Sequence, residues 1–368
     1  MKNEAQRRLF VSATNQNDGK TTSSLGLVKG FSQLGKSVGF VKPVGQRYTQ
    51  VDSQKIDEDS LLIWQACGLD CPPADKGALV VEQDFTRNYL DNPEKMHPIL
   101  EKTVLDSFAT VAEGKDLVVI EGTGHAGVGS IFGLCNARVA KLVGAKTVIV
   151  TLGGIGRPVD EVAVNRSLFE RENVPVIGVI VNKVIPEKLE QTHHYLSKAF
   201  ANCGLPLLGV IPYTPRLAWP TVQQVAETMN ATVVNGHDRL ANPVAEVIIG
   251  AMTAHNAITY VHDKALLIVP GDRDDVVLAM LSMDLLRNDL KLSGIVFTGG
   301  LAPQPQTMDL VSRTEIPVLI VDAGTYETAA GMRDVLVKIR VADEEKIQLA
   351  AKLVQDHVDL ERLWSLLA

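Results

Sequence analysis

Residues 12–22 read SATNQNDGKTT and hold the residue types and spacing best suited to chemistry in this chain. They follow the apolar run at residues 9–11 and open a helical pattern, which places a loop between a strand and a helix. Backbone N–H groups in such a loop, with the positive end of the helix dipole, can surround phosphate oxygens. Lys20 would reach the β- and γ-phosphates, and the Thr21 hydroxyl would bind Mg²⁺. The stretch therefore predicts binding of a nucleoside triphosphate.

The start of this loop departs from the strict phosphate-loop pattern. That pattern needs a glycine five residues before Gly19, where this chain has Thr14, and Ala13 stands one position earlier. A Gly-Lys-Thr tripeptide alone also fits an ordinary helix start with a glycine turn and a solvated lysine. The rest of the chain has to decide between the two interpretations.

Lys42, Glu121 and Asn182 each directly follow another short apolar run. Ligands of open α/β sheets bind at the carboxyl ends of the strands, so we expect these residues to surround the loop. Lys42 beside Lys20 would neutralise charge that develops in phosphoryl transfer, and Glu121 would hold Mg²⁺ with Thr21. Asn182 can hydrogen-bond a purine edge, although Asn is also a common turn former.

Two acidic residues and one histidine each allow two interpretations. Asp57 and Asp59 precede the helix-like residues 60–67, where carboxylates are stabilised by the helix dipole. Asp57 is also predicted to give a second contact to Mg²⁺. His125, in the glycine-rich turn after Glu121, suits either a general base or a surface polar group.

Short apolar runs alternate with helical patterns through the first 215 residues. This alternation is typical of a parallel sheet with crossover helices and predicts a doubly wound α/β domain. The predicted strands are residues 9–11, 37–41, 117–120, 147–150, 176–181 and 207–211. The predicted helices are residues 21–34, 93–112, 133–143, 158–172 and 186–203.

A second, smaller α/β series follows Pro215 and Pro220, which interrupt the rhythm. Its predicted elements are a helix at 221–229, strands at 265–269, 294–297 and 318–321, and helices at 274–286 and 326–339. A further packing helix is predicted at 344–367. These patterns predict three parts, at residues 1–217, 218–342 and 343–368.

Composition excludes several classes of protein. The chain has 368 residues, 46% apolar and 21% charged, which suits a globular protein of two domains. A net charge of −7 gives no basic field for nucleic acid, and no apolar run reaches the length of a membrane span. Four cysteines without metal-ligand spacing predict reduced, mostly buried thiols. We expect a cytoplasmic protein that binds neither nucleic acid nor membrane.

Taken together, these residues resemble the dethiobiotin synthetase superfamily of P-loop ATPases, over about residues 8–215. The superfamily includes cobyrinic acid amide synthetases and the N-terminal domain of long phosphotransacetylases, and the run at 124–130 is closest to the phosphotransacetylase type. The resemblance implies that Lys20 and Lys42 are catalytic, that Thr21 and Glu121 hold Mg²⁺, and that Asn182 faces adenine. The ATP-binding set it implies is Thr14, Asn15, Asp18, Gly19, Lys20, Thr21, Thr22 and Asn182.

Residues from about 218 to 340 resemble the DRTGG domain, through residues 270–275, 297–300 and 322–329. That domain is associated with regulatory and dimer-forming contexts, so the resemblance implies a homodimer. The residues alone allow a small anion pocket with Arg273 as its cation, or simple turns.

These observations predict a Mg²⁺-dependent, ATP-binding enzyme of the dethiobiotin synthetase type, carrying a regulatory DRTGG domain. The reaction would be phosphoryl transfer or ligation onto a small-molecule acceptor that carries a carboxylate or carbamate. The alternative is a nucleotide-sensing regulatory module without substrate chemistry of its own.

Overall fold

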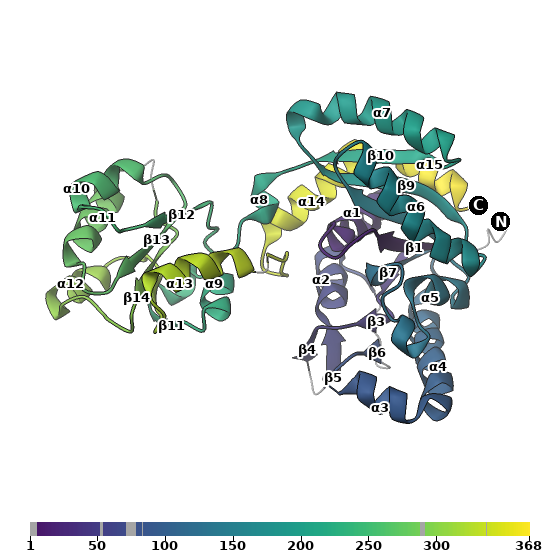
Figure 1. The fold of residues 1–368 in the computed structure, drawn as a ribbon, viewed down its shortest axis with the longest axis horizontal. Helices are drawn as coiled ribbons and strands as arrows, with labels where there is room; N and C mark the ends of the chain where they lie inside the picture. Colours follow the sequence, from purple (N-terminus) through teal and green to yellow (C-terminus); the bar gives the residue numbers. More distant parts are fainter. Residues whose placement is uncertain (1–5, 52–53, 71–78, 83, 288–290, 336) are drawn as a thin grey trace. The chain divides into compact units, whose positions relative to one another are not determined.

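The computed structural model describes residues 6–51, 54–70, 79–82, 84–287, 291–335 and 337–368. These form two compact units, Met1–Thr214 with Ile339–Ala368, and Pro215–Lys338 (Figure 1). The second unit starts three residues before the boundary expected after residue 217. The C-terminal segment, expected as a part of its own, belongs to the first unit. The chain therefore leaves the first unit, builds the second, and returns.

The first unit is built on a six-stranded parallel sheet in the order β10-β9-β8-β1-β7-β2. All six predicted strands belong to this sheet, which confirms the doubly wound α/β fold. Since the chain moves from β1 to one side of the sheet and later to the other, its switch point lies next to β1. The strands are β1 (Arg7–Ala13), β2 (Val38–Val41), β7 (Leu117–His125), β8 (Lys146–Leu152), β9 (Val176–Val184) and β10 (Leu207–Pro212).

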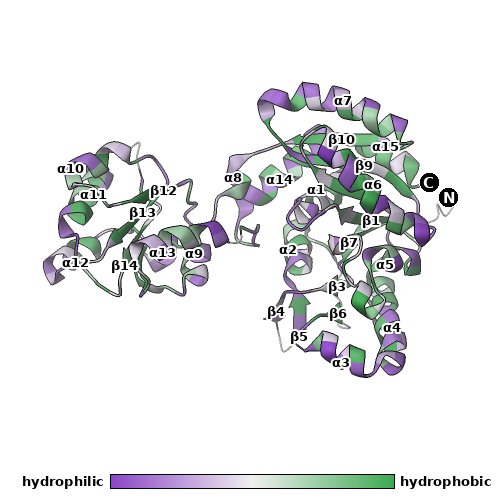
Figure 2. Cartoon of the chain, in the orientation of Figure 1, coloured by the Kyte–Doolittle hydropathy of each residue, from purple (hydrophilic) through white to green (hydrophobic). Residues whose placement is uncertain are grey.

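Apolar residues fill both faces of this sheet. Residues 9–11 of β1 and 117–120 of β7 are fully buried, as expected for strands covered by helices on both sides. In Figure 2 the strands β9 and β10 are mainly green, whereas α7 carries many purple residues. Burial of the apolar strands thus places the polar residues that follow them at the sheet edge.

Two layers of helices cover the sheet. On one side, α4, α5, α6 and α7 share one core with the strands, around the buried Phe10, Phe169 and Phe200. On the other side lie α1, α2, α14 and α15. The helices are α1 (Lys20–Gln33), α2 (Glu58–Cys67), α4 (Pro93–Ala112), α5 (Asn136–Leu142), α6 (Gly156–Arg171), α7 (Leu189–Asn202), α14 (Glu344–His357) and α15 (Leu360–Leu366).

The C-terminal segment packs tightly on α1. A Cβ atom added to Gly26 would lie 2.3 Å from Val354 Cγ2, and one added to Gly30 would lie 2.6 Å from Leu360 Cδ1. The rings of Phe31 and Trp364 lie 5.7 Å apart, centroid to centroid. The predicted single helix at 344–367 is wrong in its extent, because it is broken after His357 where the next residue bridges to the edge strand β10.

Residues 44–92 hold several elements that the sequence patterns missed. Two short pairs of strands and a helix of seven residues here are too short for hydrophobic periodicity to show. They are β3 (Val44–Gly45) with β6 (Leu79–Val80), β4 (Tyr48–Val51) with β5 (Gln54–Asp57), and α3 (Phe85–Asp91).

The second unit has a five-stranded sheet in the order β11-β15-β14-β13-β12, in which only β11 is antiparallel to its neighbour. Three of the strands were predicted. Strands β11 and β12 were not, because neither is strongly apolar throughout. The strands are β11 (Thr232–Asn235), β12 (Glu246–Ile249), β13 (Ala265–Pro270), β14 (Gly294–Thr298) and β15 (Val318–Ile320).

Helices surround this second sheet. The predicted helix at 326–339 is wrong in its extent, since α13 ends at Gly331 and a 3₁₀ turn follows. A capping box between Thr221 and Gln224 starts α9. The helices of the second unit are α8 (Pro215–Ala218), α9 (Val222–Thr228), α10 (Ala254–Ala257), α11 (Asp274–Leu286), α12 (Pro305–Val311) and α13 (Thr325–Gly331).

The cysteines of the described residues are free thiols, as expected. Cys135 is buried and Cys67 is partly buried, where desolvation raises the pKa of the thiol to about 12. Cys203 is exposed, so the expectation of mostly buried thiols is wrong there. Cys71 lies outside the described residues. Within the described chain, the helices are too short or too polar to cross a bilayer.

Candidate functional site

The loop between β1 and α1 closes on itself through the buried carboxylate of Asp18. Its Oδ2 accepts hydrogen bonds from the Thr14 hydroxyl at 2.7 Å and from the Asn15 N–H at 2.6 Å. Asn17 and Gly19 have φ values of 67° and 99°, so the backbone turns sharply twice. The side chains of Thr14 and Asp18 thus shape the loop from within, while Asn15 is partly buried.

Position 19 has no room for a side chain, because Asn182 at the end of β9 lies close to it. The Asn182 amide Nδ2 donates to the Asp18 carbonyl at 2.9 Å, and a Cβ on Gly19 would lie 2.0 Å from that nitrogen. Asn182 therefore lies beside the loop, as predicted, and its side chain contacts the backbone carbonyl of Asp18.

Lys20 lies at the first turn of α1 with only 8% of its surface exposed. Its Nζ donates to the Gly124 carbonyl at the end of β7, at 2.8 Å. Burial lowers the pKa of Lys20, and the carboxylates of Glu121 and Asp18 partly oppose that shift. The first N–H groups of an α-helix have no acceptor within the helix, so the backbone at Lys20, Thr21 and Thr22 can bind an anion.

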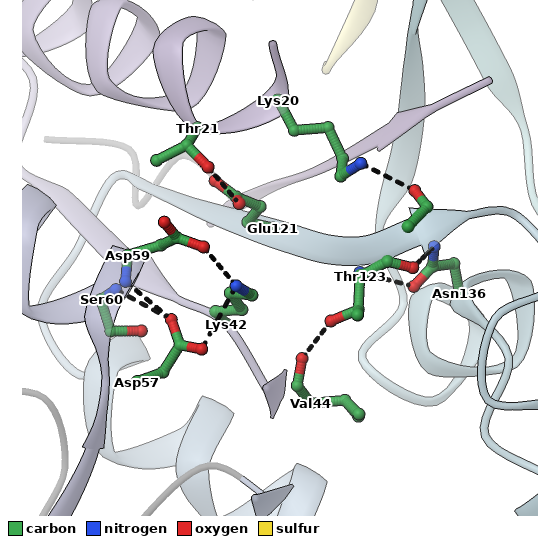
Figure 3. Close-up of polar contacts among 11 residues, drawn as sticks. Lys20, Thr21, Lys42, Val44, Asp57, Asp59, Ser60, Glu121, Thr123 and Asn136 are labelled. Carbon is green, nitrogen blue, oxygen red and sulfur yellow. Dashed lines mark hydrogen bonds and ion pairs between the residues drawn. The ribbon is translucent and has the colours of Figure 1, made fainter. Parts of the chain in front are cut away.

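Glu121 lies in β7 directly opposite Thr21, whose hydroxyl donates to Glu121 Oε1 at 2.9 Å (Figure 3). The carboxylate is buried, and its Oε2 has no hydrogen-bond partner among the described residues. Burial, with the nearby negative charge of Asp59, raises the pKa of Glu121 to about 7. A buried carboxylate oxygen without a partner is costly, which makes this oxygen a natural ligand for a cation.

Lys42, at the end of β2, is held by two buried carboxylates. Its Nζ pairs with Asp59 and lies 3.2 Å from Asp57 Oδ2 (Figure 3). Burial lowers the pKa of Lys42, but the carboxylates of Asp57 and Asp59 more than compensate, so that it lies above its usual range. Lys42 is therefore charged, and its charge is already neutralised within the protein.

Asp57 acts as the N-cap of α2. Its Oδ1 accepts from the N–H groups of Asp59 at 3.0 Å and Ser60 at 3.2 Å. Of the two interpretations left open for this residue, the helix-start carboxylate describes its contacts in this structure, together with the ion pair to Lys42. A contact from Asp57 to Mg²⁺ stays a prediction.

Two residues that the sequence analysis did not single out hold the end of β7 in place. The Asn136 side chain accepts from the Thr123 N–H at 3.0 Å and donates to the Thr123 carbonyl at 2.9 Å. The Thr123 hydroxyl donates to the Val44 carbonyl, which ties β7 to the chain after Lys42. His125 is exposed at the strand end, where its Nδ1 accepts from the Gly127 N–H at 3.2 Å.

Comparison with known proteins gives the family of each part. A family profile described as an AAA domain matches residues 7–221, more than half of the chain. The chain belongs to this family. A profile described as a DRTGG domain matches residues 224–335 of this AAA-domain protein. The predicted resemblance, a dethiobiotin synthetase-like P-loop domain joined to a DRTGG domain as in long phosphotransacetylases, is confirmed.

Among curated relatives, the phosphate acetyltransferase of Nitrosomonas europaea is 28% identical over 367 residues, covering 96% of this chain and 51% of the relative. That of Nitratidesulfovibrio vulgaris is 28% identical over 366 residues, covering 97% and 51%. The chain thus spans about half the length of the curated relatives it matches.

Two solved structures are similar to parts of this chain. MinD of Pyrococcus horikoshii, solved with Mg-ADP, has a TM-score of 0.35 and 16% identity, covering 58% of this chain and 84% of MinD. The CBS and DRTGG regulatory region of Clostridium perfringens pyrophosphatase has a TM-score of 0.27 and 21% identity. That match covers 33% of this chain and 48% of that one.

The donor set of the AAA-domain protein fits a magnesium nucleotide. Mg²⁺ usually takes one or two protein oxygens and completes its shell with water and phosphate. The Thr21 hydroxyl and the unpartnered oxygen of Glu121 supply such a pair. Across the described ranges, no group of three or more His, Cys, Asp or Glu side chains lies close enough together to hold a metal ion.

The turns of the DRTGG part are closed by their own side chains. The Arg273 guanidinium makes hydrogen bonds to both carboxylate oxygens of Asp275, at 2.8 and 3.0 Å, and to the Met252 carbonyl at 2.9 Å. The hydroxyls of Thr298 and Thr325 bond to each other at 2.7 Å. Of the two interpretations left open for these loops, the contacts favour simple turns.

Proposed function

We propose that this protein binds Mg-ATP at the loop between β1 and α1. The observation that carries the proposal is the meeting of Lys20 and Thr21 with β7, through the Gly124 carbonyl and the Glu121 carboxylate. Lys20 would contact the phosphates, and Thr21 with Glu121 would hold Mg²⁺. Thr14 and Asp18 support this assignment indirectly, since they shape the loop.

We propose further that the protein is an enzyme of the dethiobiotin synthetase type that transfers a phosphoryl group to a small acceptor. Catalysis in this class depends mainly on positioning and on neutralising charge. When bound, Mg²⁺ would offset the negative charge of the phosphates. Lys20 would orient the transferred group, and Lys42, which pairs with Asp57 and Asp59 in this structure, would hold the acceptor. A homodimer and a regulatory role for the DRTGG part belong to the same proposal.

The alternative function is a nucleotide sensor, and one observation favours it. Lys42 is fully paired with two buried carboxylates, so no positive charge is free there for a second anionic substrate. A protein in this state would bind Mg-ATP and report it, with slow turnover or none. The acetyl-transfer activity in the relatives' names is not carried over, because the chain spans about half of their length.

Calorimetric titration with Mg-ATP tests the proposal, with ADP release followed in the same samples. We expect the wild-type protein to bind and Lys20→Ala to lose binding while remaining folded by circular dichroism. Release of ADP supports the enzyme, and binding without release is the result expected of the sensor or of an enzyme that lacks its acceptor. Unchanged binding by Lys20→Ala would overturn the phosphate assignment.

A further inference from the structure

Two consecutive residues at the end of β9 bond to two consecutive carbonyls of the phosphate loop. The Asn182 amide donates to the Asp18 carbonyl at 2.9 Å, and Lys183 Nζ donates to the Asn17 carbonyl at 2.8 Å. These contacts join residues 164 and 166 positions apart in the chain. They make the loop and the end of β9 a single polar unit.

The backbone on both sides is set for these contacts. Lys183 has φ of 56° and Asn17 has φ of 67°, both in the left-handed region that non-glycine residues seldom adopt. The Asn182 Oδ1 accepts from the Lys183 N–H at 2.9 Å, which orients the amide so that its NH₂ group points to the loop. Strained backbone of this kind persists where surrounding contacts hold it in place.

The hydrogen bonds to the carbonyls of Asn17 and Asp18 affect how the loop can bind an anion. A carbonyl oxygen that faces a phosphate repels it, whereas the N–H groups of the same loop attract it. With the carbonyls of Asn17 and Asp18 held by donors from β9, the loop does not need to reorganise them when an anion arrives. Preorganisation of this kind raises affinity by reducing the cost of ordering.

We propose that Asn182 and Lys183 are positioning residues that hold the phosphate loop in its anion-binding form. This proposal rests on the proposed function and differs from the expectation that Asn182 faces adenine. The positioning role and the adenine contact predict different effects of an Asn182 substitution on a ligand that has phosphates but no base. A positioning residue affects every ligand that occupies the phosphate loop, and a base contact affects only nucleotides.

The test compares Mg-ATP with inorganic tripolyphosphate and Mg²⁺ on the full-length protein, by calorimetry. For Asn182→Ala and for Lys183→Met we expect affinity to fall about tenfold, by the same factor for both ligands, as for a lost hydrogen bond to or from a well-placed group. Asn182 carries no charge, so the effect of Asn182→Ala cannot arise from lost electrostatic attraction between its side chain and the phosphates. Lys183 is exposed, so its variant keeps the core intact even if Asn182→Ala is destabilised.

Two further variants serve as controls. Lys188→Met removes the same charge from an exposed lysine five positions on and should leave both affinities unchanged. Lys183→Arg keeps a donor and should restore most of the affinity that Lys183→Met loses. A purely structural defect would not be rescued in this way.

The outcomes separate the two proposals. Loss of ATP affinity alone in Asn182→Ala would overturn positioning in favour of a base contact. Equal behaviour of Lys183→Met and Lys188→Met, or loss in Lys183→Met without loss in Asn182→Ala, would also overturn it while leaving nucleotide binding intact. Failure of the wild-type protein to bind either ligand would overturn the proposed function itself.

Discussion

Both units build sheets of mainly parallel strands, but the units differ in how completely the polar groups at the strand ends are paired. In the first unit, Glu121 keeps a buried oxygen without a hydrogen-bond partner among the described residues, next to the Thr21 hydroxyl. In the second, Arg273 is neutralised by Asp275, and Thr298 bonds to Thr325. The first unit thus leaves a buried polar atom that a ligand can complete, whereas the turns of the second unit are completed by their own side chains.

The first turns of α1 and α11 show the same contrast. Helix α1 has no acidic residue in its first turn, so no side chain of that turn neutralises the positive end of its dipole. Helix α11 begins with Asp274 and Asp275, whose carboxylates already stabilise its dipole. We therefore expect changes in the first unit to alter anion binding and matched changes in the second to leave it unaltered.

Removing residues 339–368 should have the largest effect. The missing segment includes Val354 and Leu363, both fully buried, and burial of each such side chain contributes about 2 kcal/mol to stability. We expect calorimetric unfolding of the shortened chain to lose the transition of the first unit and to keep that of residues 215–338. A first-unit transition at the full-length temperature would contradict the role of the returning segment.

Glu121→Gln should remove the Mg²⁺ dependence of ATP binding. The amide keeps the shape of the side chain but loses the charge that a cation needs, and we expect affinity for Mg-ATP to fall at least about tenfold. Asp275→Asn is the matched change in the second unit and should have no effect. If Glu121→Gln bound Mg-ATP as tightly as the wild type, Glu121 would not be a metal contact.

Acid should weaken Mg-ATP binding in the range just below neutral pH. Burial raises the pKa of Glu121 to about 7, so protons compete with Mg²⁺ for this carboxylate as the pH falls through that value. The unliganded protein should respond in the opposite sense. Because the folded state holds this proton more tightly than the unfolded chain, the Glu121 contribution to stability falls as pH rises from about 4.5 to about 7.

Titrations at pH 6 and pH 8 measure this dependence, with Glu121→Gln as the control that removes the titrating group. An equally steep pH dependence in that variant would assign the effect to another residue. Unfolding of the second unit should not follow the same profile.

Arg273→Ala should have the smallest effect. Asp275 is exposed and Arg273 only partly buried, and ion pairs at a surface contribute about 0–1 kcal/mol. Chemical denaturation should show a change of that size in the second unit, with Mg-ATP affinity unchanged. A large loss of Mg-ATP affinity would show that the second unit contributes directly to nucleotide binding. It would contradict the expectation that only the first unit does so.

Local sequence patterns were enough to predict the sheet of the first unit and the residues at its carboxyl edge. Apolar, β-branched runs make buried strands wherever helices cover both faces, and α4 spans the residues 93–112 that its pattern predicted. Once those strands are parallel, Lys20, Lys42 and Glu121 must share one edge. The short strands β3 and β6 were missed because two residues carry no periodicity.

Only the tertiary structure decided how those residues are paired. The contacts concerned join separate parts of the chain. Helix α14 packs on α1, and Lys42 pairs with Asp57 and Asp59. Asn182 and Lys183 bond to the phosphate loop. A residue's type and its neighbours in sequence determine whether it lies in a strand, a helix or a turn. Its partner depends on which groups the completed fold buries together, because burial is what makes an unpaired charge or donor costly.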